Sequence, residues 1–513
     1  MSPPSTTDVL VVGAGPMGLL TSIGLAKQNV DTIVVDKRDR NVQVAAGRAT
    51  TLYPRSLELL EPLGVVGDLL QKGFYGWKLV TFSIDTSLND DFNITGILEH
   101  ATKGQKQVRS KYLLGADGGA SSVRQLSGIT MDFQSTSYEW IRIDGKLTTD
   151  MPGANLGFAS IETQHHGNVL WVTLDKDAHR IGYALTPHLL AKYPNGITET
   201  EAVQEAIDSI KPFNLQVDRL DWWTHYKIRQ GVTESYRKDK YVLLGGDAAH
   251  IHSSGFAQGM NTGIHDATNL VWKLAGAVKG WYKDSVLDTY HTERHAAATR
   301  LIAIDKEASI VISGEIPPQY EGLGLTPDEI LYKTWSENVS FSVGLGVSYA
   351  ESVLNQTTLD TCVTTGKRCP DAFICSPGTI LRLRLYDALL QDGAAGRWSI
   401  VVFAGNTALT KKAYATVRKC LPKVADSHQG MVRLITLMAG SAGSAWSALD
   451  GPAVGTFYFD GYGSAHAQYG VDLTAGAIAV IRPDNILGFA AGLTEVSLVE
   501  NYFSQFVNRY KRL

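Results

Sequence analysis

The spacing of apolar residues along the chain changes its period twice. Near the N-terminus, residues 8–12 and 32–35 are short apolar runs typical of buried strands, and residues 16–27 between them have helical spacing. A further apolar run at 242–244 is followed by residues 260–278, in which apolar side chains recur on one helical face. Strands that alternate with helices in this way predict an α/β unit built on a parallel sheet.

The middle of the chain has a period of two. Residues 156–185 alternate between apolar and polar side chains with two breaks, which predicts an antiparallel meander. We expect this meander to belong to a second sheet, over about residues 130–228. In that sheet Trp171, Thr173 and Tyr183 are expected to line one face of an aromatic cavity.

After residue 366 the composition shifts again. This part contains apolar runs that predict three strands and a closing helix, at 399–403, 432–438, 477–481 and 496–510. The whole chain is therefore predicted to be α/β and α+β. Residues 1–365 would form two interleaved domains and residues 366–513 a third.

Composition argues against several classes of function. The 513 residues carry a net charge of -4 and show no basic stripe, so nucleic acid and anionic membranes are not expected as partners. No run of 18 apolar residues and no signal-peptide pattern is present, so we expect a cytoplasmic protein that does not enter membranes. The four cysteines form no CxxC pair, and the histidines lack metal-ligand spacing. Neither a dithiol centre nor a metal site is predicted, and no GxSxG motif follows a strand to suggest a hydrolase.

The first predicted strand leads directly into the glycine motif GAGPMG. Gly13 allows a tight turn, Gly15 allows backbone to approach a pyrophosphate, and Gly18 allows close packing of helix and strand. Asp36 ends the second strand, where a carboxylate binds ribose hydroxyls. Together these features predict a dinucleotide site, without separating FAD from NAD. Arg48, in a following loop, either reaches this ligand or is a solvated loop residue.

Two further acidic residues follow apolar runs. Asp117 lies in the segment KYLLGADGG and Asp247 in LLGGDAAH, each at the predicted carboxyl end of a strand. Several such strand ends favour a long ligand laid across one edge of a sheet. The alternative is that both aspartates only form turns.

Three blocks in this order, VVGAGPMG, KYLLGADGGASSVR and LLGGDAAH, resemble the class A FAD-dependent aromatic monooxygenases of the p-hydroxybenzoate hydroxylase and phenol hydroxylase type. The resemblance extends over most of the chain. It implies an FAD site formed by Gly13, Gly15, Gly18, Asp36, Arg48, Asp117, Asp247, Met260 and Asn261. It also implies a C-terminal thioredoxin-like domain that lacks a dithiol here and either covers the core or helps to form a homodimer.

The resemblance also implies a reaction. NADPH or NADH binds transiently and reduces FAD, which reacts with molecular oxygen to give a C4a-hydroperoxide. This species hydroxylates a phenolic or polyketide-like aromatic substrate. The side chains considered for the substrate pocket are Tyr226, on a predicted strand, and His252 and Phe256, in the loop beside the flavin. The residue that activates the substrate is not identified.

The chain departs from the family pattern at two places. The family's HSPxGGQGMN reads HSSGFAQGMN here, so Ser254 replaces the proline and Phe256 and Ala257 replace a glycine pair. Residues 78–107 are short and polar, so either a subdomain is trimmed or part of the flavin-binding wall is missing. Two alternatives therefore stay open. One is an FAD-dependent oxidase, Baeyer–Villiger or rearranging flavoenzyme, and the other is a catalytically silent flavin-binding protein.

Overall fold

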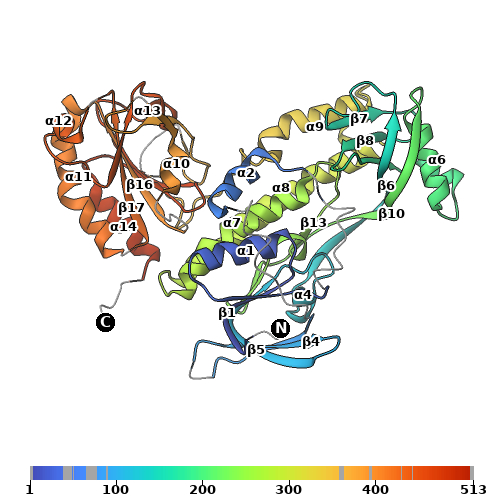
Figure 1. Cartoon of the computed structure of the whole chain (residues 1–513), viewed down its shortest axis with the longest axis horizontal. Helices are drawn as coiled ribbons and strands as arrows, with labels where there is room; N and C mark the ends of the chain where they lie inside the picture. The colour runs from blue at the N-terminus through green and yellow to red at the C-terminus, as the bar shows by residue number, and fades with distance from the viewer. Residues whose placement is uncertain are drawn as a thin grey trace.

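The computed structural model of the protein describes residues 4–38, 49, 51–64, 78–87, 90–357, 363–379, 381–391, 396–428, 430–441 and 443–508. Within these ranges the chain forms three β-sheets with helices packed on them, spread along one long axis (Figure 1). The architecture is α/β and α+β, as predicted. None of the described helices is both long enough and apolar enough to cross a lipid bilayer.

The first sheet has the order β11-β12-β5-β1-β2, with β3 and β4 added antiparallel beside β5. Its strands are β1 (Thr6–Val12), β2 (Thr32–Val35), β3 (Lys78–Ile84), β4 (Ile94–His100), β5 (Gly104–Gly115), β11 (Arg237–Lys238) and β12 (Val242–Leu244). In the parallel part, Val12 pairs with both Val35 and Gly115, and Gly115 also pairs with Leu244. Four strands therefore end at one level, which is the edge where open α/β sheets place their ligands.

Helices from distant parts of the sequence cover this sheet. They are α1 (Pro16–Lys27), α2 (Pro54–Leu60), α4 (Ser122–Leu126), α7 (Gln258–Val278) and α8 (Asp284–Ile312). Helices α1 and α7 pack so closely that a Cβ added to Gly24 would lie 2.7 Å from Cγ1 of Val271. The helices predicted at 16–27 and 260–278 and the strand predicted at 32–35 are confirmed.

The short segment 78–107 forms ordinary sheet structure. Its residues build β3, β4 and the start of β5 as an antiparallel meander at the side of the parallel strands. The preceding residues 65–77 lie outside the described part of the chain. The sequence indicated a trimmed subdomain or a missing part of the flavin-binding wall here, and the segment itself adds antiparallel strands to the first sheet.

The second sheet is antiparallel, with the order β13-β10-β6-β9-β8-β7. Its strands are β6 (Met131–Thr149), β7 (Phe158–Glu162), β8 (Asn168–Thr173), β9 (His179–Ala184), β10 (Leu215–Thr233) and β13 (His250–Ile251). Helices α5 (Pro187–Lys192) and α6 (Glu199–Ser209) contribute to the core on one face, and α9 (Pro327–Ser342) follows α8. The predicted meander is confirmed as β7, β8 and β9.

The expectation that Trp171, Thr173 and Tyr183 line an aromatic cavity is wrong. Trp171 and Tyr183 are almost fully buried in the core beneath α6. The hydroxyl group of Tyr183 donates to the carbonyl oxygen of Ala202 at 2.8 Å, and Trp171 and Thr173 both donate to the carbonyl oxygen of Ala154. Alternation identifies which side chains share a face of a strand, but it does not show which face a helix will cover.

The third sheet has the order β15-β14-β18-β17-β16-β19-β20 and lies at the end of the molecule opposite β6 and β10 (Figure 1). Its strands are β14 (Phe373–Cys375), β15 (Arg382–Arg384), β16 (Trp398–Gly405), β17 (Val432–Ala439), β18 (Thr456–Asp460), β19 (Ala477–Ile481) and β20 (Leu487–Ala491). Helices α11 (Thr407–Ser427), α12 (Ala445–Leu449) and α14 (Val496–Phe506) contribute to one core, and α10 (Leu385–Leu390) and α13 (Ser464–Tyr469) to the other. The three predicted strands and the closing helix are confirmed.

A buried ionic cluster joins the third sheet to the long helices. Glu293 on α8 accepts hydrogen bonds from Lys273 on α7 at 2.7 Å and from Arg482 at 2.6 and 2.9 Å. Arg482 lies in the turn between β19 and β20 and also pairs with Asp484 at 2.7 Å. Burial by itself raises the pKa of Glu293, but Arg482 and Lys273 outweigh burial and hold the pKa well below its usual range. Each buried charge of the cluster is therefore stabilised by the opposite charges beside it.

We expect Glu293→Gln to destabilise the protein by about 3–5 kcal/mol, because it leaves Lys273 and Arg482 buried without their shared carboxylate. Differential scanning calorimetry would measure this loss as a lower unfolding temperature. Glu337→Gln is the control, because Glu337 is exposed and its ion pair with Lys333 is 3.7 Å long. Equal unfolding temperatures for the two variants would contradict the role given to the cluster.

Candidate active site

The level edge of the first sheet brings together three predicted site carboxylates. Asp36 Oδ2 accepts the backbone N–H of Ala14 at 2.8 Å, which ties the glycine turn after β1 to the end of β2. Asp117, after β5, accepts from Ser121 Oγ at 2.5 Å and from the N–H of Ser122 at 2.7 Å, so its carboxylate caps α4. Asp247, after β12, is exposed and has no polar partner within the described residues. It is the one of the three carboxylates that no protein contact occupies there.

The glycines of the first motif differ in what surrounds them. A Cβ on Gly13 would lie 2.1 Å from the carbonyl oxygen of Ala116, and one on Gly18 would lie 2.0 Å from that of Gly13. A Cβ on Gly15 would meet no atom of the described residues within 4 Å. Gly15 is also the N-cap of α1, and no side chain caps that helix. Packing therefore requires glycine at positions 13 and 18. Gly15, in contrast, lies beside the N–H groups at the start of α1, and such groups bind anionic ligands.

Asp266, on α7, fixes the loop that carries Asp247. Its Oδ2 accepts the N–H of Gly246 at 2.9 Å and lies 2.9 Å from Nε2 of His250, and its Oδ1 accepts from Arg294 Nε at 2.7 Å. Burial alone raises the pKa of Asp266, but Arg294 and His250 outweigh it and keep the pKa far below its usual range. Sequence reasoning missed Asp266, since a single acidic residue within a helical stretch is most often a surface residue.

The loop before α7 has an unusual backbone. Ala257, the N-cap of α7, has a φ of +52°, a left-handed conformation that glycine adopts more readily. The family pattern has glycine here, so the loop keeps a glycine-like shape although the residue has changed. Asn261 is buried and its side chain contacts the segment before α2: its Oδ1 accepts from Tyr53 N–H at 2.9 Å. Met260 is partly buried against the first core. The Asn261 side chain is thus occupied by contacts within the protein.

The substrate-pocket candidates lie around the same loop. The Tyr226 hydroxyl is 2.7 Å from Ser254 Oγ, which joins β10 to the loop. Phe256 packs edge-to-face on Trp335 of α9, with ring centroids 5.2 Å apart. His252 places Nδ1 2.7 Å from the carbonyl oxygen of Ser253. The structure therefore places Tyr226 against the loop but does not bring all three side chains onto one point.

A buried carboxylate that sequence reasoning missed anchors this loop. Asp305 on α8 accepts from the backbone N–H of Ser253 at 2.7 Å, from Ser253 Oγ at 2.6 Å and from Gln230 Nε2 at 2.6 Å. Arg48, by contrast, falls outside the described residues, and its role stays a prediction.

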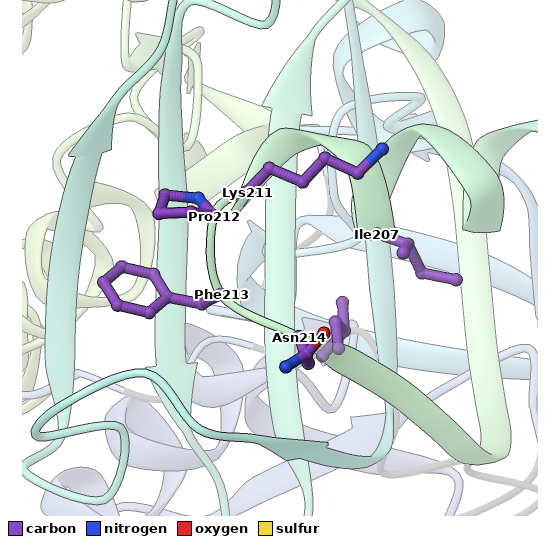
Figure 2. A pocket seen from close by; sticks show the side chains of 6 residues that line it. Ile207, Lys211, Pro212, Phe213 and Asn214 are labelled. Carbon is purple, nitrogen blue, oxygen red and sulfur yellow. The ribbon is translucent and has the colours of Figure 1, made fainter.

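A surface pocket of about 560 Å³ lies elsewhere, between α6 and the start of β10 (Figure 2). It is lined by Ile207, Lys211, Pro212, Phe213, Asn214 and Leu215. Phe213 and Leu215 also belong to the core on the α6 side of the second sheet. The pocket is therefore separate from the edge that carries Asp117 and Asp247.

Sequence comparison identifies two families along the chain. The family described as FAD binding domain matches residues 6–77 and 78–305, more than half of the chain. The family described as phenol hydroxylase, C-terminal dimerisation domain, matches residues 450–511. The first match divides at the short segment that begins with β3.

Individual relatives agree with these matches. The FAD-dependent monooxygenase hkm7 of Aspergillus hancockii is 28% identical over 429 residues, covering 79% of this chain and 78% of its own. The 3-hydroxybenzoate 4-monooxygenase of Comamonas testosteroni is 24% identical, covering 98% and 95%. That alignment has 620 positions, more than the 513 residues of this chain, so the relative has segments that this chain lacks.

A solved structure of the flavin-dependent monooxygenase PieE, in complex with FAD and substrate, has the same fold. It superimposes with a TM-score of 0.75 at 18% identity, covering 98% of this chain and 99% of that one. The similarity in fold therefore extends over all three sheets of the chain.

We expect Gly15→Ser and Gly18→Ser to fail in different ways. Serine suits an N-cap, and position 15 borders open space, so Gly15→Ser should keep the unfolding temperature while blocking close approach of a pyrophosphate. Gly18→Ser should lower the unfolding temperature, because its Cβ would overlap the carbonyl oxygen of Gly13. Thermal unfolding and the FAD content of the purified protein would separate the two effects. Retention of FAD by Gly15→Ser at the wild-type level would contradict the assignment.

Proposed function

The chain belongs to the FAD binding domain family, and we propose that it is an FAD-dependent monooxygenase that uses NAD(P)H and molecular oxygen to hydroxylate a phenolic or polyketide-like aromatic substrate. The observation that carries the proposal is the level sheet edge, where Gly15 faces open space and the Asp247 carboxylate has no polar partner within the described residues. FAD-dependent monooxygenases among the relatives support the reaction type.

The residues at the edge fit an extended dinucleotide. FAD, when bound, would supply the transfer of electrons from NAD(P)H to oxygen. The free N–H groups at the start of α1 would bind the pyrophosphate beside Gly15. Asp36 uses one lone pair of each carboxylate oxygen on backbone N–H groups, which leaves others for ribose hydroxyls. Asp247 and the backbone around Met260 and Asn261 would contact the part of FAD nearest the loop.

The substrate side is the face of the second sheet that carries Tyr226. We assign Tyr226 to the orientation of the substrate, because its hydroxyl already bonds to Ser254 in the loop next to the cofactor edge. Phe256 and Trp335 form an apolar wall that would exclude water from this region. The Ser254 hydroxyl, where the family has a proline, adds a polar group to the loop.

The third sheet belongs to a separate unit in this proposal. We propose a division near residue 366, with a thioredoxin-like unit over 366–513 that has a structural role. The parallel strands β16, β17 and β18, with α11 between the first two, support this. The dimerisation-domain match at 450–511 supports assembly as a homodimer.

The proposal is tested first by the visible spectrum of the purified protein. Bound flavin absorbance, NADPH oxidation that phenols accelerate, and a product heavier by one oxygen atom are the expected results. A product without added oxygen would favour the oxidase or rearranging alternative. Retained flavin without NADPH turnover would favour a silent binding protein, and absence of flavin would overturn the proposal.

We expect Tyr226→Phe to lower kcat/KM for a phenolic substrate about tenfold, the effect of losing one well-placed hydrogen bond. Steady-state NADPH oxidation would measure it. Tyr138→Phe is the matched control, because the Tyr138 hydroxyl donates to Glu315 at 2.9 Å and does not contact the loop. A similar loss in both variants would mean that Tyr226 has only a general structural effect.

A further inference from the structure

Two arginines lie on the substrate face of the second sheet. On β6, Trp140, Arg142 and Asp144 share one face, and Ile141 and Ile143 belong to the core on the other. Across the strands, Arg142 lies opposite Gly182 of β9, and Asp144 opposite Arg180. The two arginines therefore occupy neighbouring positions on the face that carries Tyr226.

The two arginines differ in their partners. Arg180 forms a buried two-point ion pair with Asp144, at 2.7 and 2.8 Å. Arg142 has no carboxylate within 4.0 Å in the part of the chain that the structure describes. Its recorded contacts there are one long hydrogen bond to the carbonyl oxygen of Ser254, at 3.4 Å, and the ring of Tyr226, whose centroid is 5.8 Å from Arg142 Cζ.

An arginine in this position is poorly compensated. It is partly buried, and burial lowers the pKa of its guanidinium, with only weaker help from Tyr226 and Asp144. A guanidinium offers five N–H donors in a planar fork, and the one weak hydrogen bond found here engages only one of them. Removing such a cation from water costs free energy unless an anion or several acceptors replace the water. The remaining donors match the geometry of a carboxylate or another ionised oxygen.

The residues around Arg142 are a glycine and partly buried aromatic and hydroxyl side chains. Gly182, opposite, has no side chain, and a Cβ there would touch Arg142 Cγ at 3.4 Å. Along β10, Trp222, Thr224 and Tyr226 are partly buried, and they pair with Asp144, Arg142 and Trp140 in turn. The same face therefore presents aromatic surface, a hydroxyl group and a cation that no carboxylate of the described residues pairs with. The Ser254 contact places the cation beside the loop near the cofactor edge.

We propose that Arg142 is a substrate-binding residue that pairs with an ionised oxygen, a carboxylate or a phenolate, on the aromatic substrate. This inference rests on the proposed function and narrows its substrate class to anionic aromatics. Arg180 has a different task, because its charge is already balanced by Asp144. The sequence contained a signal for Arg142 and Asp144, since WIRID places these two charged residues within an otherwise apolar segment.

The test uses two pairs of probes with matched shape, titrated calorimetrically into the FAD-loaded protein. 3-Hydroxybenzoate and 3-hydroxybenzamide report on a carboxylate. 4-Nitrophenol and 4-nitroanisole, at a mildly alkaline pH, report on a phenolate. We expect the wild-type protein to prefer at least one anion over its neutral partner, and Arg142→Gln to weaken binding of that anion by at least about tenfold. Binding of the neutral probes should stay within about twofold, and Arg142→Lys should recover part of the loss.

Thermal unfolding provides a second readout. Because Arg142 has no carboxylate partner among the described residues, Arg142→Met should leave the unfolding temperature unchanged or raise it. Arg180→Met should lower it, because Asp144 would stay buried without that ion pair. The proposal is overturned if the wild type binds neither anion, if Arg142→Gln weakens charged and neutral probes equally, or if Arg142→Met destabilises as much as Arg180→Met. If the Arg142 proposal fails in one of these ways, hydroxylation of a neutral phenol by the wild-type enzyme would still support the proposed function.

Discussion

The buried carboxylate of Asp266 is the contact on which the geometry of the cofactor edge depends. It holds the backbone of Gly246 from one side and receives Arg294 from the other, so the turn after β12 is fixed to both α7 and α8. A charge at this depth is stable only when its partners are present, and the partners come from separate elements. The position of Asp247 is therefore determined by tertiary contacts of its neighbours rather than by its own side chain.

The same two helices carry a second buried charge. On α8, Glu293 and Arg294 are consecutive and pair with Lys273 and Asp266 of α7, which are seven residues apart. Asn269 lies between those two positions on α7 and donates to Glu293 at 2.7 Å. Helix α7 thus has a polar stripe that is buried, in addition to its apolar face. Such a stripe specifies one alignment of the two helices, because any other alignment would separate the charges.

Much of the architecture could be predicted because it depends on local patterns. The glycine turn, the spacing to Asp36, the meander and the strand at 477–481 each follow from a few consecutive residues. The partners of Asp266 and Glu293 could not be predicted, because each network joins residues far apart in the chain. The burial of Trp171 was misjudged for the same reason, since the face of a strand that is covered depends on where α6 packs.

In the candidate site too, local patterns could be predicted from the sequence and contacts between distant residues could not. Motif spacing placed Gly15, Asp117 and Asp247 at strand ends, and the register shows why these ends meet. Sequence reasoning also selected Tyr226 as one of several aromatic residues, and the structure adds its contact with Ser254. Arg142 differs, because its importance lies in the lack of a carboxylate partner within the described chain. Such a lack is visible only when the neighbouring strands are in place.

The turn between β19 and β20 has a consequence for how the chain is made. Arg482 and Asp484 in this turn reach α7 and α8, whose sequences are synthesised some two hundred residues earlier. Helices α7 and α8 therefore leave the ribosome before Arg482, their partner in the buried ionic cluster, has been synthesised. They would carry Glu293 and Lys273 without Arg482 until the last part of the chain is made, and docking of the third sheet would complete this buried cluster.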